Sequence, residues 1–246
     1  MRKVLRSFTH FFVQNNSSKQ VLSKFNINNC SVMGDSRYDR VMELLNQNNE
    51  VPYLKNFKNN KTCIVAGSTW RKDDDIIIKF INSNSSSKIC WIIAPHQINL
   101  NYIKELQNQI ELNSILLSEL NFENSQNINL IIVDSVGILT KLYSYADISY
   151  VGGGMGKTGL HNTLEPAVHK IPVIVGQNFK NFPEVSELIN LNGIISVNNY
   201  QSFETKIIEL IQSRHKRDKM GKINFEYIQN NIGASEKVIS YLNEKK

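Results

Sequence analysis

Three consecutive glycines followed by a short polar segment are the part of this sequence best suited to chemistry. The strand-like run 148–151 ends in Gly152, Gly153 and Gly154, and the segment 161–165 then opens a predicted helix. Consecutive glycines suit a backbone that turns sharply or touches a ligand. A helix N-terminus offers free N–H groups and a positive dipole end to an anion. Because Glu165 falls in the first turn and can accept two hydroxyls, the stretch suits the phosphate and ribose of a nucleotide.

Polar residues also follow three other apolar runs of strand length. They are Ser68 and Thr69, His96, and Asp134. A hydroxyl-bearing turn such as Ser68–Thr69 suits a phosphate and suits an ordinary strand-to-helix turn equally well. Ligands of parallel α/β sheets bind beyond the carboxyl ends of the strands. We therefore predict that these residues and the three glycines share one site.

Other interpretations of several polar residues stay open. Asp134 is also suited to capping the helix after it, and a lone histidine such as His96 is as often structural. Lys157, inside the glycine loop, is either a counter-charge for a phosphate or a mobile surface lysine. The segment Asp73–Asp75 is interpreted as acidic residues that stabilise a helix N-terminus, in preference to metal ligands. The sequence predicts neither a metal site nor a cofactor.

The elements that must position these residues alternate between strands and helices. The predicted strands are 10–14, 62–66, 89–94, 130–133, 148–151, 172–175 and 194–197, with a further candidate at 115–117. The predicted helices are 18–24, 73–82, 100–112, 137–145, 162–169, 183–190, 203–213 and 223–243. The central strands are continuous Ile/Val runs, which is typical of a parallel sheet covered on both faces. The expected fold is a doubly wound, Rossmann-like α/β sheet.

Composition limits the classes of function. The chain has 246 residues, is 41% hydrophobic and has a net charge of +6, so it can bury a core. Its basic clusters, such as Arg214–Arg217, are interpreted as solvated helix faces or as an attraction to an anionic membrane or substrate. No aromatic interleaving favours nucleic acid. The three cysteines are read as buried thiols, and neither a signal peptide nor a membrane-spanning run is apparent.

The glycine segment also resembles a known family. Gly152–Gly154, followed by Gly-Leu-His-Asn-Thr-Leu-Glu-Pro-Ala at 159–167, resembles the donor-site signature of the 3-deoxy-D-manno-octulosonic acid (Kdo) transferases. Four further segments match the same family in the same order. They are Phe12–Gln14, Gly34–Val41, Gly67–Trp70 and Ile92–His96. The resemblance runs from about residue 11 to about residue 195.

The resemblance implies a GT-B glycosyltransferase that moves Kdo from CMP-Kdo to a lipid A precursor in lipopolysaccharide synthesis. By the same resemblance, Glu165 accepts ribose hydroxyls, Asn162 bonds a phosphate or the Kdo carboxylate, and His161 orients Asn162. The loop at Asp134 is expected near the base and ribose. The implied location is the cytoplasmic face of the inner membrane, with peripheral association through a part of the family that this chain lacks.

The resemblance covers only the donor half of such an enzyme. We expect residues 1–40 to form the end of an N-terminal domain and the interdomain junction, residues 41–222 to bind the nucleotide sugar, and the helix 223–246 to pack on the N-terminal domain. No residue here is a clear general base, so the base and the acceptor site are expected in the missing half. The chain is then a fragment, a split-gene product or the product of a decaying gene.

Two rival functions remain at this point. One is a GT-B transferase or an epimerase-like enzyme that uses a UDP-sugar, because such enzymes also place a helix glutamate at the ribose. The pair His161-Asn162 before Leu164-Glu165 favours Kdo transfer over it. The other rival is a non-catalytic remnant, or a subunit that works only with a partner chain.

Overall fold

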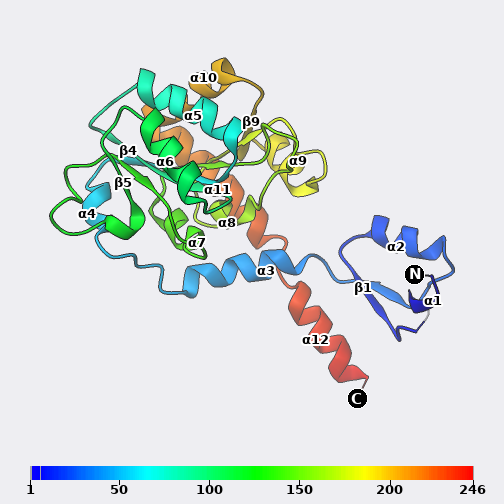
Figure 1. The fold of residues 1–246 in the computed structure, drawn as a ribbon. Coiled ribbons are helices and arrows are strands. Elements are labelled where there is room, and N and C mark those ends of the chain that lie inside the picture. Colours follow the sequence, from blue (N-terminus) through cyan, green and yellow to red (C-terminus); the bar gives the residue numbers. More distant parts are fainter. Residues whose placement is uncertain (1, 6, 246) are drawn as a thin grey trace. The chain divides into compact units, whose positions relative to one another are not determined.

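A computed structural model describes residues 2–5 and 7–245 of the chain, which form two compact units (Figure 1). Unit 1 comprises Met1–Asn46 and Tyr227–Lys246, and unit 2 comprises Gln47–Glu226. All the residues predicted to form the site lie in unit 2.

Unit 2 is built on a seven-stranded sheet in which every pairing is parallel, in the order β5-β6-β4-β3-β7-β8-β9. Its strands are β3 (Thr62–Thr69), β4 (Ile89–Pro95), β5 (Ser114–Leu116), β6 (Leu130–Ile132), β7 (Ile148–Val151), β8 (Val173–Gly176) and β9 (Ile194–Val197). The order reverses between β3 and β7, since the chain adds β4 on one side of β3 and later adds β7 on the other. The carboxyl edge at β3 and β7 is therefore a topological switch point.

Helices cover both faces of this sheet (Figure 1). Successive strand residues alternate between two cores: Ile64 packs with the residues of one core and Val65 with those of the other. On the first face lie α5 (Arg71–Ser83), α6 (Leu100–Gln109) and α10 (Tyr200–Gln212); on the second lie α4 (Leu54–Lys58) and α7 (Leu139–Leu142). The predicted doubly wound α/β fold is confirmed.

Short elements complete unit 2. They are α8 (Leu164–Ala167), α9 (Pro183–Asn190), and the 3-10 turns η2 (Leu117–Glu119) and η3 (Tyr143–Tyr145). The helix α11 (Arg214–Gln229) contains the boundary between the units. Its buried Asn224 donates to the Ile171 carbonyl at 2.8 Å, and a Cβ on Gly221 would lie 1.8 Å from the Lys170 carbonyl oxygen. The helix is therefore held closely against the start of β8.

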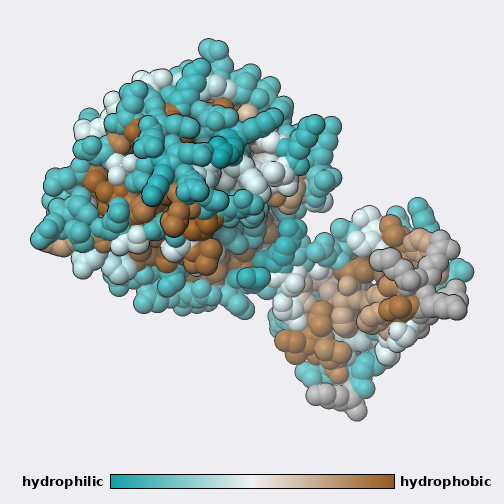
Figure 2. Space-filling model, in the orientation of Figure 1, coloured by the Kyte–Doolittle hydropathy of each residue, from teal (hydrophilic) through white to brown (hydrophobic). Residues whose placement is uncertain are grey.

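Unit 1 contains a sheet of only two strands, β1 (Phe11–Val13) and β2 (Cys30–Val32), which pair in parallel. Its helical elements are α1 (Arg2–Leu5), α2 (Asn16–Ser23), α3 (Ser36–Glu43), α12 (Ala234–Glu244) and the 3-10 turn η1 (Leu44–Asn46). Asp39 of α3 accepts hydrogen bonds from the backbone N–H groups of Gly233 and Ser235, which fixes the start of α12. Figure 2 shows apolar residues gathered on the visible surface of unit 1.

Two predicted helices are corrected here, and two elements were not predicted. The continuous helix 223–243 is wrong, because residues 230–233 leave the helical path and Gly233, with a φ of 100°, adopts a left-handed backbone before α12. The strand β2 and the helix α4 were not predicted; both are short and lack a clear period. The predicted helix 137–145 is divided into α7 and η3.

Within the described ranges, no helix is both long and apolar enough to cross a membrane.

Candidate functional site

The candidate site lies at the carboxyl ends of β3, β4 and β7, where the sheet order reverses. Backbone hydrogen bonds join these strand ends: Gly152 donates to the Gly67 carbonyl at 2.9 Å, and His96 donates to the Thr69 carbonyl at 2.9 Å. Farther along the loop, His161 donates to the Gly152 carbonyl at 3.2 Å. The sequence expectation that these strand ends meet at one edge is therefore met by the topology and by direct contacts.

The three glycines allow loops to approach one another closely. A Cβ on Gly152 would lie 2.3 Å from the Ser68 carbonyl oxygen, and one on Gly153 would lie 2.0 Å from the Gly159 carbonyl oxygen. A Cβ on Gly154 would lie 2.8 Å from the backbone nitrogen of Gly176. Gly153 also has a φ of 93°, which side chains disfavour. The packing of the protein itself thus requires glycine here, and contact between these glycines and a ligand stays a prediction.

Two of the predicted site histidines meet at a tryptophan. Trp70 and His96 stack with ring centroids 4.6 Å apart, and the His96 and His161 rings are 4.3 Å apart. The Trp70 indole N–H donates to Nε2 of His161 at 3.2 Å. Because an indole only donates, Nε2 is the acceptor and the proton of neutral His161 is on Nδ1. Burial, and then the neighbouring His96, lowers the pKa of His161, which favours this neutral form.

Asp73 holds the glycine loop against the end of β3. Its side chain is fully buried and accepts hydrogen bonds from Gly153 N at 2.8 Å, Tyr150 Oη at 2.6 Å and Trp70 N at 3.0 Å, with a longer one from Met155 N at 3.4 Å. The bond to Trp70 N caps α5, as the sequence interpretation of this acidic segment expected. The bonds to β7 and the loop after it were not expected, and they make Asp73 a positioning residue for the loop.

Glu165 is oriented by Asn162. The Asn162 amide donates to Glu165 Oε1 at 3.1 Å, and its carbonyl oxygen accepts from Leu164 N at 3.0 Å. The Glu165 carboxylate also lies near the buried Tyr143 hydroxyl: burial, and secondarily Glu165, raises the pKa of Tyr143. The Tyr143 hydroxyl also lies against Gly67 of β3, because a Cβ on Gly67 would be 2.1 Å from its oxygen. Glu165, which neighbours the same hydroxyl, therefore lies near the end of β3.

The helix that carries Glu165 is shorter than predicted. The sequence predicts a helix over 162–169, whereas α8 spans four residues. Pro166 lacks an N–H, and Asn162 already accepts the N–H of Leu164. One helical turn has a small macrodipole. The expected attraction of an anion by a full helix N-terminus is therefore corrected: this segment contributes individual N–H groups and the Glu165 carboxylate.

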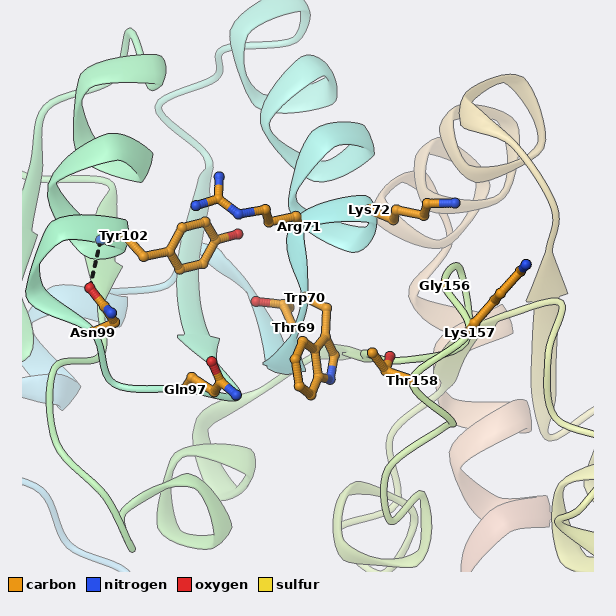
Figure 3. A pocket seen from close by; sticks show the side chains of 10 residues that line it. All are labelled: Thr69, Trp70, Arg71, Lys72, Gln97, Asn99, Tyr102, Gly156, Lys157 and Thr158. Carbon is orange, nitrogen blue, oxygen red and sulfur yellow. Dashed lines mark hydrogen bonds between the residues drawn. The ribbon is translucent and has the colours of Figure 1, made fainter.

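A cavity of about 400 Å3 opens beside the glycine loop (Figure 3). It is lined by Thr69, Trp70, Arg71, Lys72, Gln97, Asn99, Tyr102, Gly156, Lys157 and Thr158. The Arg71 guanidinium lies over the Tyr102 ring, 4.5 Å from its centroid, and pairs with Glu105 at 2.9 Å. Lys72 and Lys157 add two cations on the side of the glycine loop. The cavity is therefore cationic and partly aromatic, which suits a planar or anionic ligand.

Asp74 lies buried at the base of this region. The Tyr102 hydroxyl donates to Asp74, yet burial dominates and raises the pKa of Asp74 from 3.8 to about 7.

Within the described residues, no group of three or more potential metal ligands forms here or elsewhere.

The remaining predicted site residues take different positions. Ser68 is partly exposed, with a φ of 53° at a register shift between Gly67 and Thr69. The Thr69 hydroxyl is buried beside Asp74, where it only partly offsets the rise in the pKa of Asp74 that burial causes. A ligand contact by Thr69 stays a prediction. Asp134 shares the carboxyl edge, but its carboxylate accepts from the N–H and hydroxyl of Ser118 at 3.2 and 2.5 Å, on the β5 side of the sheet.

Sequence reasoning missed Trp70, Asp73 and Tyr102 as parts of the site. Trp70 was noted only within the family-like segment Gly67–Trp70. A usable signal existed for Asp73: three acidic residues directly after a strand end precede the apolar run Ile76–Ile78, so some of them had to face the sheet.

Comparisons with known proteins show which proteins this chain is similar to. No family model matches the sequence. A 3-deoxy-D-manno-octulosonic acid transferase of Haemophilus influenzae is 29% identical over 222 residues, which cover 86% of this chain. The chain is therefore similar in sequence to the Kdo transferases over most of its length. It spans about half the length of that relative, 51%.

Solved structures agree at the level of the fold. The C-terminal CMP-Kdo binding domain of WaaA from Acinetobacter baumannii superposes with a TM-score of 0.64 at 21% identity, over 78% of this chain and 97% of that domain. UDP-GlcNAc 2-epimerase from Neisseria meningitidis gives a TM-score of 0.62 at 18% identity, over 96% of this chain and 61% of the epimerase. Both matches support the GT-B, Rossmann-like architecture of unit 2.

Proposed function

We propose that this chain is the donor-binding half of a Kdo transferase, and that CMP-Kdo binds at the carboxyl edge of unit 2. The observation that carries the proposal is the convergence of three family-like segments of unit 2, Gly67–Trp70, Ile92–His96 and Gly152–Ala167, on the switch point between β3 and β7. The ends of both strands, the His96–Trp70–His161 stack and the Asn162–Glu165 pair meet there. The segment that resembles the family's donor-site signature, Gly152–Ala167, lies at this edge of the sheet.

Each group has a proposed role. The Glu165 carboxylate accepts the ribose hydroxyls, and the Asn162 amide keeps it in position. Backbone N–H groups of the glycine loop, with Lys157, bind the phosphate. Lys72 and Arg71 provide further positive charge, which suits a donor whose sugar is itself an acid. Ser68, Thr69 and His96 line the approach from β3 and β4, and the loop at Asp134 lies toward the base.

Transfer itself requires a base close to the acceptor hydroxyl. We infer that an N-terminal half supplies that base and binds the lipid A precursor, and that it brings the enzyme to the cytoplasmic face of the inner membrane. The chain spans about half the length of its curated relative, which supports a division of labour of this kind. Activity then belongs to the two halves together.

A UDP-sugar enzyme is the second candidate, and the fold match to the epimerase favours it. The two candidates differ in the base that they bind. Calorimetric titration of the chain with CMP and with UDP separates them: Kdo transfer predicts tighter binding of CMP, and preference for UDP would overturn it.

The ribose assignment is tested in the same assay. Glu165→Ala should weaken CMP binding by about 1–3 kcal/mol, the usual value of a charged hydrogen-bond partner. Glu111→Ala removes the same charge from an exposed residue three positions before β5, toward the amino ends of the strands. It should leave the affinity unchanged. Equal affinities of wild type and Glu165→Ala would show that the ribose is bound elsewhere.

The division of labour needs a separate experiment. Kdo transfer to a lipid A precursor is measured for the chain alone and with a separately expressed N-terminal half of a relative. Turnover only in the mixture is the expected result. Turnover by the chain alone would contradict the division. CMP binding with no turnover in either case would favour a non-catalytic role.

A further inference from the structure

A second cavity, of about 390 Å3, lies at the opposite, amino edge of the sheet in unit 2. Its wall includes Thr62, where β3 begins, Asp147 just before β7, and Pro172 just before β8. The full length of the strands therefore separates it from the glycine loop. Five basic side chains line it, against two acidic ones, Asp147 and Asp218. The basic residues, which define what is called here the basic pocket, are Lys58, Lys61, Lys170, Arg214 and Arg217.

Most of this positive charge is positioned without being neutralised. Lys61 donates to the Ile128 carbonyl and the Asn129 amide oxygen at 2.9 and 2.8 Å. Arg217 donates through one nitrogen to the last carbonyls of α10, at 2.7 and 3.0 Å. The Lys170 ammonium lies 4.3 Å from the centroid of the Phe225 ring. In the described part of the chain, none of these three cations has a carboxylate within ion-pair distance.

The two acids are already occupied. Asp147 pairs with Lys58 at 2.9 Å and also accepts the backbone N–H of Cys63 at 2.8 Å. Asp218 pairs with Arg214 at 3.7 Å in an exposed, and therefore weak, pair. The pocket thus keeps a net charge of +3 from Lys61, Lys170 and Arg217.

The walls of the pocket are held rigidly. Asn224 and Gly221 hold α11 against residues 170–171, as described above, and a Cβ on Gly193 would lie 2.1 Å from the Asn224 amide oxygen. Because carbonyl oxygens hold Lys61 and Arg217, little ordering of these two cations remains to be done when a ligand binds. Fixed, unneutralised cations in a concave site are the arrangement that binds doubly charged oxyanions.

We propose that the basic pocket binds phosphate groups, independently of the nucleotide-sugar site at the other edge. Lys61, Lys170 and Arg217 are the groups that contact the oxyanion, and Lys58 and Asp147 form the floor. The phosphate comes from a soluble phosphorylated molecule or from a phospholipid headgroup, and two probes distinguish these sources.

The test uses the full chain. Inorganic pyrophosphate is the soluble probe, titrated while backbone amide signals are followed by NMR. Vesicles of phosphatidylcholine, with and without phosphatidylglycerol, are the lipid probe, and binding is measured by co-sedimentation. Amide shifts are expected at 58–62, 146–147, 170–172 and 214–218, and not only in the glycine loop. Lys170→Gln should weaken binding about tenfold, the loss of one charged contact.

Lys222→Gln is the matched control, because Lys222 is exposed on α11, the helix that carries Arg214 and Arg217, and does not line the pocket. Weaker binding of either probe to Lys170→Gln, with Lys222→Gln unchanged, supports the proposal, and the probe that binds identifies the source. Binding of neither probe, equal losses in the two variants, or shifts confined to the glycine loop would overturn it. The wild-type shift map decides the outcome even if Lys170→Gln fails to fold.

Discussion

Unit 1 and unit 2 differ in how well each buries its own sheet. Unit 2 surrounds seven parallel strands with two cores. Unit 1 has two parallel strands, and ten of the fifteen large hydrophobic side chains exposed within the described ranges belong to it, including Phe8, Phe12 and Ile239. Parallel sheets normally have both faces covered, and a pair of strands is marginal by itself. Unit 2 therefore resembles a finished domain, whereas unit 1 resembles part of one.

This difference agrees with the proposed division of labour. The proposed donor site is positioned by a sheet whose two faces are both covered within unit 2. It therefore needs little support from other parts of the protein to bind its ligand. A small sheet with exposed apolar residues is suited to contact with further structure. We expect a supplied N-terminal half to reduce self-association of the chain, which light scattering measures. Unchanged self-association would count against this role of unit 1.

The largest expected effect is on the core of unit 2. Phe203 is fully buried and packs edge-on against Phe80 and Tyr150, so Phe203→Ala should lower the free energy of unfolding by about 3–5 kcal/mol. Ile239→Ala, at a residue of unit 1 that is 59% exposed, should change it by less than about 0.5 kcal/mol. Chemical denaturation measures both. Similar losses in the two variants would remove the contrast between the units.

Asp73 gives the next largest effect, and it reports on the site. Asp73→Asn replaces one of the two carboxylate oxygens, which accept hydrogen bonds, by an NH2 group, which donates. That NH2 group would face backbone N–H groups and the Tyr150 hydroxyl, which now donate to Asp73. We expect a loss of about 2–4 kcal/mol in stability and a clear loss of CMP affinity in the protein that remains folded. Asp75→Asn, the neighbouring change, serves as the control. Full CMP affinity in folded Asp73→Asn would show that the loop does not need this anchor.

Asp74 predicts a dependence of stability on pH. Burial raises the pKa of Asp74 from 3.8 to about 7 in the folded protein, so the unfolded chain loses this proton at lower pH than the folded one. The contribution of Asp74 to stability is therefore greatest below about pH 4 and declines as pH rises to about 7. Asp74→Asn removes this decline. Relative to wild type, the variant should gain about 1–3 kcal/mol between about pH 4 and pH 8, and a constant difference would contradict the buried acid.

His161 gives the smallest effect. Its pKa is lowered by burial and by His96, so its protonation in the folded state is disfavoured and stability falls as pH drops below about 6.5. Trp70→Phe removes the N–H that donates to neutral His161 and opens the site. The pKa of His161, followed by NMR, should rise. A lower value in the variant would contradict the assigned tautomer.

The sequence predicts the sheet of unit 2 well, because a buried parallel strand is a continuous apolar run and needs little context. The strands 148–151 and 194–197 match the structure to the residue. Positions that depend on distant contacts were not predictable in this way. The role of Asp73 depends on Gly153, eighty residues farther along the chain. The start of α12 depends on Asp39, which accepts the N–H of Gly233. The short length of α8 depends on Asn162 and Pro166.

The most direct measurement compares CMP binding by the whole chain and by residues 47–231, which contain unit 2 and the complete α11. Circular dichroism first establishes that the shorter chain is folded. Because the proposed donor site lies entirely in unit 2, calorimetry should give the same CMP affinity for both, within about twofold. A folded 47–231 chain that fails to bind CMP, while the whole chain binds it, would contradict the account.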